Sequence, residues 1–279
     1  MSEEMPDIFE ILKKDPQYNQ LVKEFGNDVN LVYPAKYRNI FGISRVLFDS
    51  KSGPYARVAK NTQYNDIEYW YSTINGEVQE KLTAVYYHYV NIKNLEVVTI
   101  NHSRRMVKRL KQLKLDRPVT IGFNFRKFGC EYEAFILQLQ ACFEHFIHST
   151  AYYFNFKTTK PEHFLKKIRE LAEKDQMAER ILRRFEVALP SLVKVIISKS
   201  REFPEGYSER DRIAHLGQVF LNPLNIIFNP SENVTILPVG RYDGSTAFTN
   251  HPQLSESIEP LMFTLFDLIS ESYMFIFKD

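Results

Sequence analysis

Hydrophobic residues in the second half of the chain recur at the three- and four-residue spacing of helices that bury one face. This spacing predicts a helix over 132–154, whose apolar positions are Tyr132, Phe135, Ile136, Leu139, Cys142, Phe143, Phe146 and Ile147. A second long helix is predicted from Pro161, a residue suited to a first helical turn, to Pro190, which ends or kinks it. A third helical segment follows over 192–201. A final helix is predicted to turn these residues inward: Ile258, Leu261, Met262, Leu265, Leu268, Ile269 and Ile276.

Between the third and the final helix the pattern changes to short elements. Ser208, with Asp211 three residues later, resembles a capping box and predicts a short helix that extends through His215. The segments 224–228 and 234–239 then flank a turn, which is the pattern of a β-hairpin. A four-helix bundle is the simplest fold that buries all the long apolar stripes together, with the hairpin inserted before the last helix.

The first half of the chain has a mixed, mostly helical pattern. The predicted elements are two short helices near 9–12 and 21–25, extended segments at 29–33 and 43–48, a loop at 52–54, two helices within 65–89 separated at Asn75 and Gly76, and a strand at 119–125. The predicted fold class is therefore mainly α. It comprises an N-terminal region of unknown role, residues 1–127, and a four-helix-bundle-like domain, residues 128–279.

Composition favours a packed globular protein. Of the 279 residues, 44% are hydrophobic and 25% are charged, and this length suffices for one large domain or two ordinary ones. The two cysteines, Cys130 and Cys142, lie in one predicted helix or its entrance, so we expect neither a disulfide framework nor a CxxC zinc site. We expect no signal peptide and no membrane span, which makes the cytoplasm the predicted location.

The net charge of +2 excludes a protein built as a whole to coat a polyanion, so any nucleic-acid site has to be local. One local candidate is a basic helical face, formed by Arg104, Arg105, Lys108, Arg109, Lys111 and Lys114. An apolar stripe of Met106, Leu110 and Leu113 lies beneath it. Arg104, Arg105, Lys108 and Arg109 are candidates for contacting an RNA backbone, although a solvated helix face is the more common role of such a pattern.

The run from Arg210 to His215 combines the residue types needed for acid–base chemistry on a phosphate ester. At about 100° per residue, Asp211 and His215 share one helix face, where the carboxylate can orient the imidazole. Ile213 falls on roughly the opposite side and would anchor the helix, so His215 is expected to face out of the core. Arg210 and Arg212 flank the polar face, where a guanidinium can bind a phosphate with paired donors.

These residues resemble the signature of the HEPN superfamily, in which an Arg and a polar residue are followed, after about three further residues, by a His. Arg210, Asp211 and His215 match it, and the resemblance extends over roughly 128–279. It implies a metal-independent endoribonuclease without a cofactor, often a toxin or defence effector, that acts on RNA as a homodimer. A protein antitoxin would be a further partner. His215 would deprotonate a ribose 2′-hydroxyl, and Arg210 would stabilise charge on the phosphate.

Two other functions remain open at this point. The helical domain could bind RNA, a nucleotide or a partner protein without cutting, or it could be a scaffold whose aromatic stripes serve dimerisation. An assay of RNA cleavage with chelator present separates the endoribonuclease from the binding module that does not cut, and a scaffold would show no affinity for RNA. His145 and His148 with Glu144 lack an identifiable third metal ligand, so we interpret them as a solvated or hydrogen-bonded face and predict no metal site.

Overall fold

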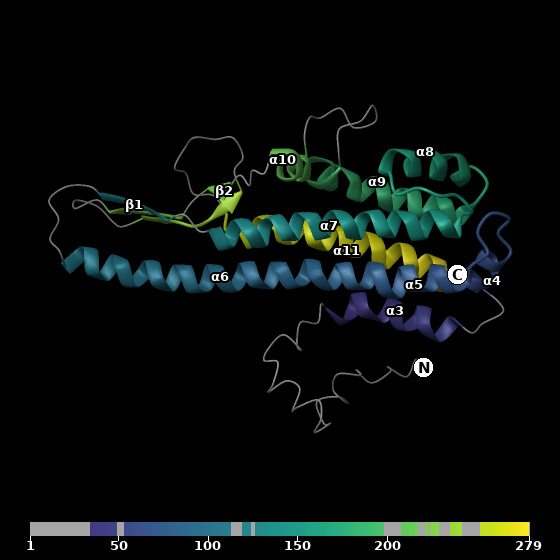
Figure 1. Ribbon diagram of the computed structural model, residues 1–279, viewed down its shortest axis with the longest axis horizontal. Coiled ribbons are helices and arrows are strands. Elements are labelled where there is room, and N and C mark those ends of the chain that lie inside the picture. Colours follow the sequence, from purple (N-terminus) through teal and green to yellow (C-terminus); the bar gives the residue numbers. More distant parts are fainter. Residues whose placement is uncertain are drawn as a thin grey trace, which may run out of the picture.

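The computed structural model describes residues 34–48, 53–112, 119–123, 126–197, 208–216, 221–222, 224–228, 235–241 and 252–278. Within these ranges the protein is mainly helical and carries a small antiparallel sheet near one end of the molecule (Figure 1). The predicted mainly α fold class is thereby confirmed. The predicted elements at 9–12, 21–25 and 29–33 lie outside the described residues.

One continuous helical path runs along the length of the molecule (Figure 1). It consists of α5 (Ile67–Ser72), the π-helical turn η2 (Thr73–Val78) and α6 (Gln79–Gln112), about 70 Å in all at 1.5 Å per residue. The predicted interruption at Asn75 and Gly76 is wrong, because the π turn absorbs both residues. The Asn75 amide nitrogen donates to the carbonyl of Tyr71 at 3.3 Å and to the hydroxyl of Ser44 at 2.9 Å, so its N–H groups are used within the fold.

Two short helices precede this path. Helix α3 (Ala35–Leu47) includes most of the segment predicted as extended at 43–48, so that prediction is wrong. Tyr37, Ile40, Phe41 and Ser44 are all buried, and their spacing of three and four residues is that of a helix face. Helix α4 (Gly53–Ala59) begins inside the predicted loop, where Gly53 adopts a φ of +73° that favours glycine.

The long helices of the second half follow the predicted pattern with one difference. Helix α7 (Arg126–Tyr153) confirms the predicted first helix. The predicted second helix is two, α8 (Pro161–Ala172) and α9 (Gln176–Ile196). Asp175 starts α9, since its carboxylate accepts the backbone N–H groups of Met177 at 2.9 Å and Ala178 at 3.2 Å.

Pro190 does not end α9, which continues through it to Ile196 and so includes the start of the predicted third segment. Two elements complete the helical part, namely α10 (Glu209–Leu216) and α11 (Leu254–Lys278). Both were predicted, and every apolar position predicted to face inward on α11 is buried.

The sheet joins strands from both halves of the chain. Strands β3 (Leu224–Phe228) and β4 (Thr235–Leu237) form the predicted hairpin. Strand β1 (Val119–Phe123), also predicted, pairs antiparallel with the other edge of β3, in the order β1-β3-β4. A second ladder pairs β2 (Leu221–Asn222) with β5 (Gly240–Arg241). The pairing of β1 with the hairpin was not predicted from the sequence.

A single large hydrophobic core contains residues from both sides of the predicted boundary at 127. The most extensive contact between helices joins α6 to α7, and α11 packs against α3, α6, α7 and α9. Near the start of α6 the core is aromatic, with Trp70 between Tyr55, Tyr153 and Phe277. The buried Trp70 indole donates to the carbonyl of Ser149 at 2.8 Å, which satisfies its polar group.

Within the described part of the chain, α11 alone is long and apolar enough to cross a membrane. In this structure, however, 56% of its most apolar window is buried inside the protein. The helices packed around it, α3, α4, α6, α7 and α9, account for this burial. Packing in the core is thus sufficient to explain why α11 is so hydrophobic.

Candidate functional site

Helix α10, which carries the Arg210–His215 run, is held at both its start and its apolar face. The Ser208 hydroxyl accepts the backbone N–H of Asp211 at 3.2 Å, which is the capping interaction predicted from the sequence. Ile213 is only 5% exposed and belongs to the main core, so its predicted inward direction is confirmed. The helix packs against α7 and α9.

The Arg210 guanidinium connects α10 to α7. Its Nε donates to Oε1 of Gln140 at 2.5 Å, and its Nη1 donates to Oδ1 of Asp211 at 3.0 Å. Gln140 in turn donates from Nε2 to Oε1 of Glu144 at 2.6 Å, one turn farther along α7. The remaining nitrogen, Nη2, has no hydrogen-bond partner in the described part of the chain, and the side chain is 27% exposed. Arg210 is therefore held in place while keeping N–H groups for a ligand.

Asp211 is buried, with 4% of its surface exposed, and its carboxylate pairs with Arg210. The sequence predicted that this carboxylate orients His215. The backbone of His215 lies in α10 four residues later, but its side chain is outside the described residues, so this interaction and the predicted outward direction of His215 stay predictions. In the structure Asp211 fixes the arginine of the motif.

A second polar contact between the same helices joins Glu209 to Tyr132, whose hydroxyl donates to Oε2 of the carboxylate. Sequence reasoning did not single out Tyr132 or Gln140 as partners of α10. Their separation of eight residues on one helix was the available signal, because residues at multiples of four lie along one ridge of a helix. Only the packing of α10 on α7 makes this ridge a contact surface for Arg210 and Glu209.

The other predicted nucleic-acid-binding residues are exposed, but only one of them lies on the same helix as Arg210. Arg212 is exposed on α10. The side chains of Arg104, Arg105, Lys108 and Arg109 are exposed near the end of α6. Leu110 beneath them is buried against Ile226 of the sheet, as the amphipathic pattern predicts. In Figure 1 this end of α6 lies beside the sheet, far along the molecule from α10. The structure therefore does not bring the four basic residues of α6 to the Arg210 motif.

The histidines of α7 have separate hydrogen-bonded partners. His145 pairs through Nδ1 with Glu77 at 2.8 Å, and Nε2 of His148 lies 3.1 Å from the hydroxyl of Tyr69. Burial lowers the pKa of His148 below its ordinary value, which favours the neutral imidazole. Among the residues that the structure describes, no three His, Cys, Asp or Glu side chains are grouped to hold a metal ion.

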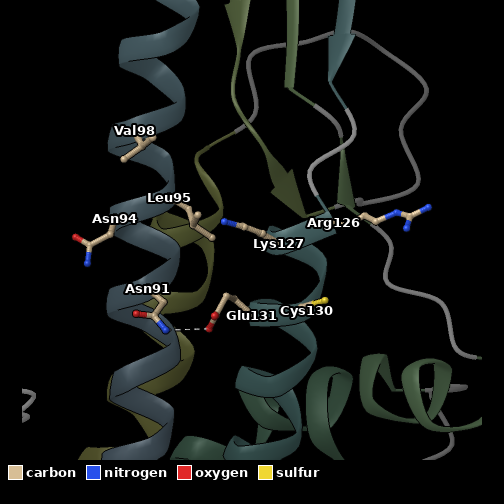
Figure 2. A pocket seen from close by; sticks show the side chains of 8 residues that line it. All are labelled: Asn91, Asn94, Leu95, Val98, Arg126, Lys127, Cys130 and Glu131. Carbon is tan, nitrogen blue, oxygen red and sulfur yellow. Dashed lines mark hydrogen bonds between the residues drawn. The ribbon is translucent and has the colours of Figure 1, made fainter. Parts of the chain in front are cut away.

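A groove of about 500 Å³ lies between α6 and the start of α7 (Figure 2). It is lined by Asn91, Asn94, Leu95, Val98, Arg126, Lys127, Cys130 and Glu131. Oε2 of Glu131 receives two hydrogen bonds, from Nδ1 of His88 at 2.8 Å and from Nδ2 of Asn91 at 3.2 Å. Sequence reasoning missed this groove, because its two walls come from segments that were assigned to different regions of the chain.

Comparisons of the chain with models of known protein families, with curated proteins and with solved structures give no match. The features of this protein that can carry a function are therefore the side chains of α10, their contacts with α7, and the groove between α6 and α7.

Proposed function

We propose that this protein is a metal-independent endoribonuclease of HEPN type, in which residues 128–279 provide the four-helix-bundle-like domain of that family. The observation that supports the proposal is the state of Arg210. Two of its nitrogens are bound by Gln140 and Asp211, and among the residues that the structure describes none takes up the N–H groups of the third, on a partly exposed side chain. A guanidinium that is already oriented can stabilise charge without first reorganising.

In the proposed reaction, the imidazole of His215 takes the proton of a ribose 2′-hydroxyl. The 2′-oxygen attacks the adjacent phosphorus, and the bond from phosphorus to the 5′-oxygen of the next nucleotide breaks. That 5′-oxygen takes up a proton from the second motif of a dimer, and a 2′,3′-cyclic phosphate remains. Nη2 of Arg210 donates to a non-bridging oxygen, whose negative charge grows during attack.

The proposal includes a cytoplasmic homodimer, with a protein antitoxin as a further partner. A single short helix offers one shallow site, whereas a two-fold axis would pair two motifs across a shared cleft. We expect light scattering to give twice the monomer mass, and we expect activity to fall on dilution. A monomer at high concentration whose specific activity is constant on dilution would contradict the dimer.

The decisive experiment is cleavage of single-stranded RNA by the purified protein in the presence of EDTA, with detection of cyclic-phosphate ends. His215→Ala is expected to lower the rate by about 10²- to 10⁴-fold, because a positioned acid–base group is lost. His163→Ala, at an exposed histidine of α8, is the matched control and should cut at the wild-type rate. Absence of cleavage by the wild-type protein, or undiminished cleavage by His215→Ala, would refute the proposal that this protein is an endoribonuclease.

A second function is favoured by the same contacts. Because Nε of Arg210 bonds Gln140 and so fastens α10 to α7, the motif also has a structural role that a non-catalytic RNA-, nucleotide- or protein-binding module would need. Such a module would bind RNA without cutting it. RNA binding by wild-type protein that leaves every RNA intact would therefore assign this second function.

A further inference from the structure

Four side chains from two helices point toward one another in the groove between α6 and α7. Figure 2 shows Asn91 and Leu95 extending from α6 and Lys127 and Glu131 extending from α7 to meet them. Val98 lies at the upper end of the same wall and is 66% exposed. The groove thus combines an apolar wall, a cation and a carboxylate.

The carboxylate of Glu131 is fixed and only half used. A carboxylate offers about four acceptor positions, and the bonds from His88 and Asn91 take the two on Oε2. Oε1 has no partner within the described ranges, and the side chain is 27% exposed. Lys127 is exposed and has no ion-pair partner there either. A ligand would therefore meet two open acceptor positions and one uncommitted positive charge.

We propose that this groove binds a guanine ribonucleotide, and the choice of RNA as its source rests on the proposed function. Guanine presents two neighbouring donors, N1–H and N2–H, on one edge, and both can converge on the single open oxygen, Oε1. Leu95 and Val98 pack against the face of the base, and Lys127 neutralises the phosphate. Uracil fits poorly, since its single N3–H stands between two carbonyl oxygens that the carboxylate would repel.

The edge of α6 that forms the groove continues into part of the basic face. At about 100° per residue, Arg105 and Arg109 lie within about 20° of Val98, whereas Arg104 and Lys108 are turned away by about 80° or more. An RNA strand that leaves the groove along α6 would pass Arg105 and then Arg109. The groove and these two arginines together form an extended surface for a single strand.

The test measures binding separately from cleavage. Calorimetry compares 5′-guanosine monophosphate with 5′-uridine monophosphate. Fluorescence anisotropy compares a 2′-O-methyl oligouridine with the same strand containing one guanosine, because the methyl group prevents 2′-hydroxyl attack. Glu131→Gln and Val98→Glu alter the groove. Their matched controls are Glu133→Gln, at an exposed position of α7, and Val97→Glu, at a neighbour that is 59% exposed and does not line the groove.

We expect wild-type protein to bind the guanosine probes at least about 10-fold more tightly than the uridine probes, as hydrogen bonds to a charged group imply. Glu131→Gln should lose this preference, Val98→Glu should weaken binding of both kinds of probe because it removes part of the apolar wall, and both controls should behave as the wild type. Equal affinity of the wild-type protein for guanosine and uridine probes would overturn the proposal, as would guanosine binding that Val98→Glu leaves undiminished in a folded protein. Val98→Glu keeps the test informative if Glu131→Gln fails to fold, since Val98 is exposed and makes little packing contact.

The two binding assays distinguish a free nucleotide from RNA as the ligand. Together with the cleavage assay, they also distinguish failure of the groove proposal from failure of the endoribonuclease proposal. Guanosine monophosphate that binds as tightly as the oligonucleotide would identify a free nucleotide as the ligand and would support the groove. If wild-type protein cuts no RNA but Glu131→Gln still weakens guanosine binding, the endoribonuclease is refuted and the groove stands. If it cuts RNA but neither guanosine probe is preferred over uridine, the groove is refuted and the endoribonuclease stands.

Discussion

Replacing Arg210 by Ala should destabilise the fold as well as lower activity. Arg210 makes two hydrogen bonds, to Gln140 on α7 and to Asp211 on its own helix. Asp211 is 4% exposed, so its carboxylate has little access to water once the guanidinium is removed. The substitution therefore weakens the attachment of α10 to α7 and removes the ion-pair partner of a buried charge.

The expected size of this effect follows from the exposure of the two groups. A hydrogen bond to a charged group contributes about 1.5–3 kcal/mol, and an exposed ion pair contributes about 0.2–1 kcal/mol. Because the Arg210 side chain is 27% exposed, we place both bonds near the lower end of the first range. The free energy of unfolding should then fall by about 3 kcal/mol. Arg104→Ala, at an exposed arginine of α6, should change it by less than about 0.5 kcal/mol.

Urea unfolding followed by circular dichroism measures these changes, and a double-mutant cycle isolates the Arg210–Asp211 pair. Arg210→Ala, Asp211→Ala and the double variant should give a coupling free energy of about 1 kcal/mol. A loss below about 0.5 kcal/mol for Arg210→Ala, or strictly additive single changes, would refute the reasoning. The motif would then lie on a loosely attached helix, and the preorganisation of Arg210 would lose its basis.

Three further predictions concern the fold around the site. Asp175→Ala should lower stability by about 1.5 kcal/mol in urea unfolding, because α9 loses its cap and Arg57 loses an ion pair at 2.6 Å. Burial raises the pKa of Asp175, but the bond from Arg57 and the helix N–H groups outweigh burial and lower it. The stability that Asp175 contributes should therefore be lost as the pH falls below the ordinary pKa range of a carboxyl. The free energy of unfolding of Asp175→Ala should not show this decrease. Burial lowers the pKa of His148, so stability should fall as the pH drops below about 6.5, and His148→Asn should unfold at the same urea concentration at pH 7.5 and 5.5. Tyr273→Phe should cost about 1 kcal/mol, measured the same way, by removing the buried bond to Ser149 at 2.5 Å, and no loss would contradict that role.

The sequence alone was sufficient for elements whose apolar spacing is long and regular. The stripe of α7 and the inward positions of α11 were predicted because a buried helix face repeats every three to four residues, whatever lies against it. The hairpin of β3 and β4 and the short helix α10 were predicted from turn and capping residues, which act locally. Ile213 was correctly placed inward by the same argument.

Elements in which local signals compete were predicted less well. Asn75 and Gly76 usually interrupt a helix, but the π turn keeps the path continuous and gives the Asn75 amide partners on α3 and α5. The apolar pattern runs without a break through α8 and α9 and predicted one helix. Asp175 instead starts a separate helix, because its carboxylate accepts N–H groups that a continuous helix would bond internally. Pro190 was expected to end or kink α9, yet the helix continues to Ile196 because its apolar face stays buried.

Tertiary structure alone decided which side chains meet. The sequence paired Asp211 with His215 on one helix face but did not predict that the carboxylate of Asp211 also contacts Arg210, which binds Gln140, seventy residues earlier. The groove of Asn91, Lys127 and Glu131 exists because α6 and α7 pack together, and the pairing of β1 with β3 likewise joins distant segments. Periodicity specifies the face that a helix buries, but it carries no information about the partner helix, because any apolar surface satisfies the hydrophobic effect equally well.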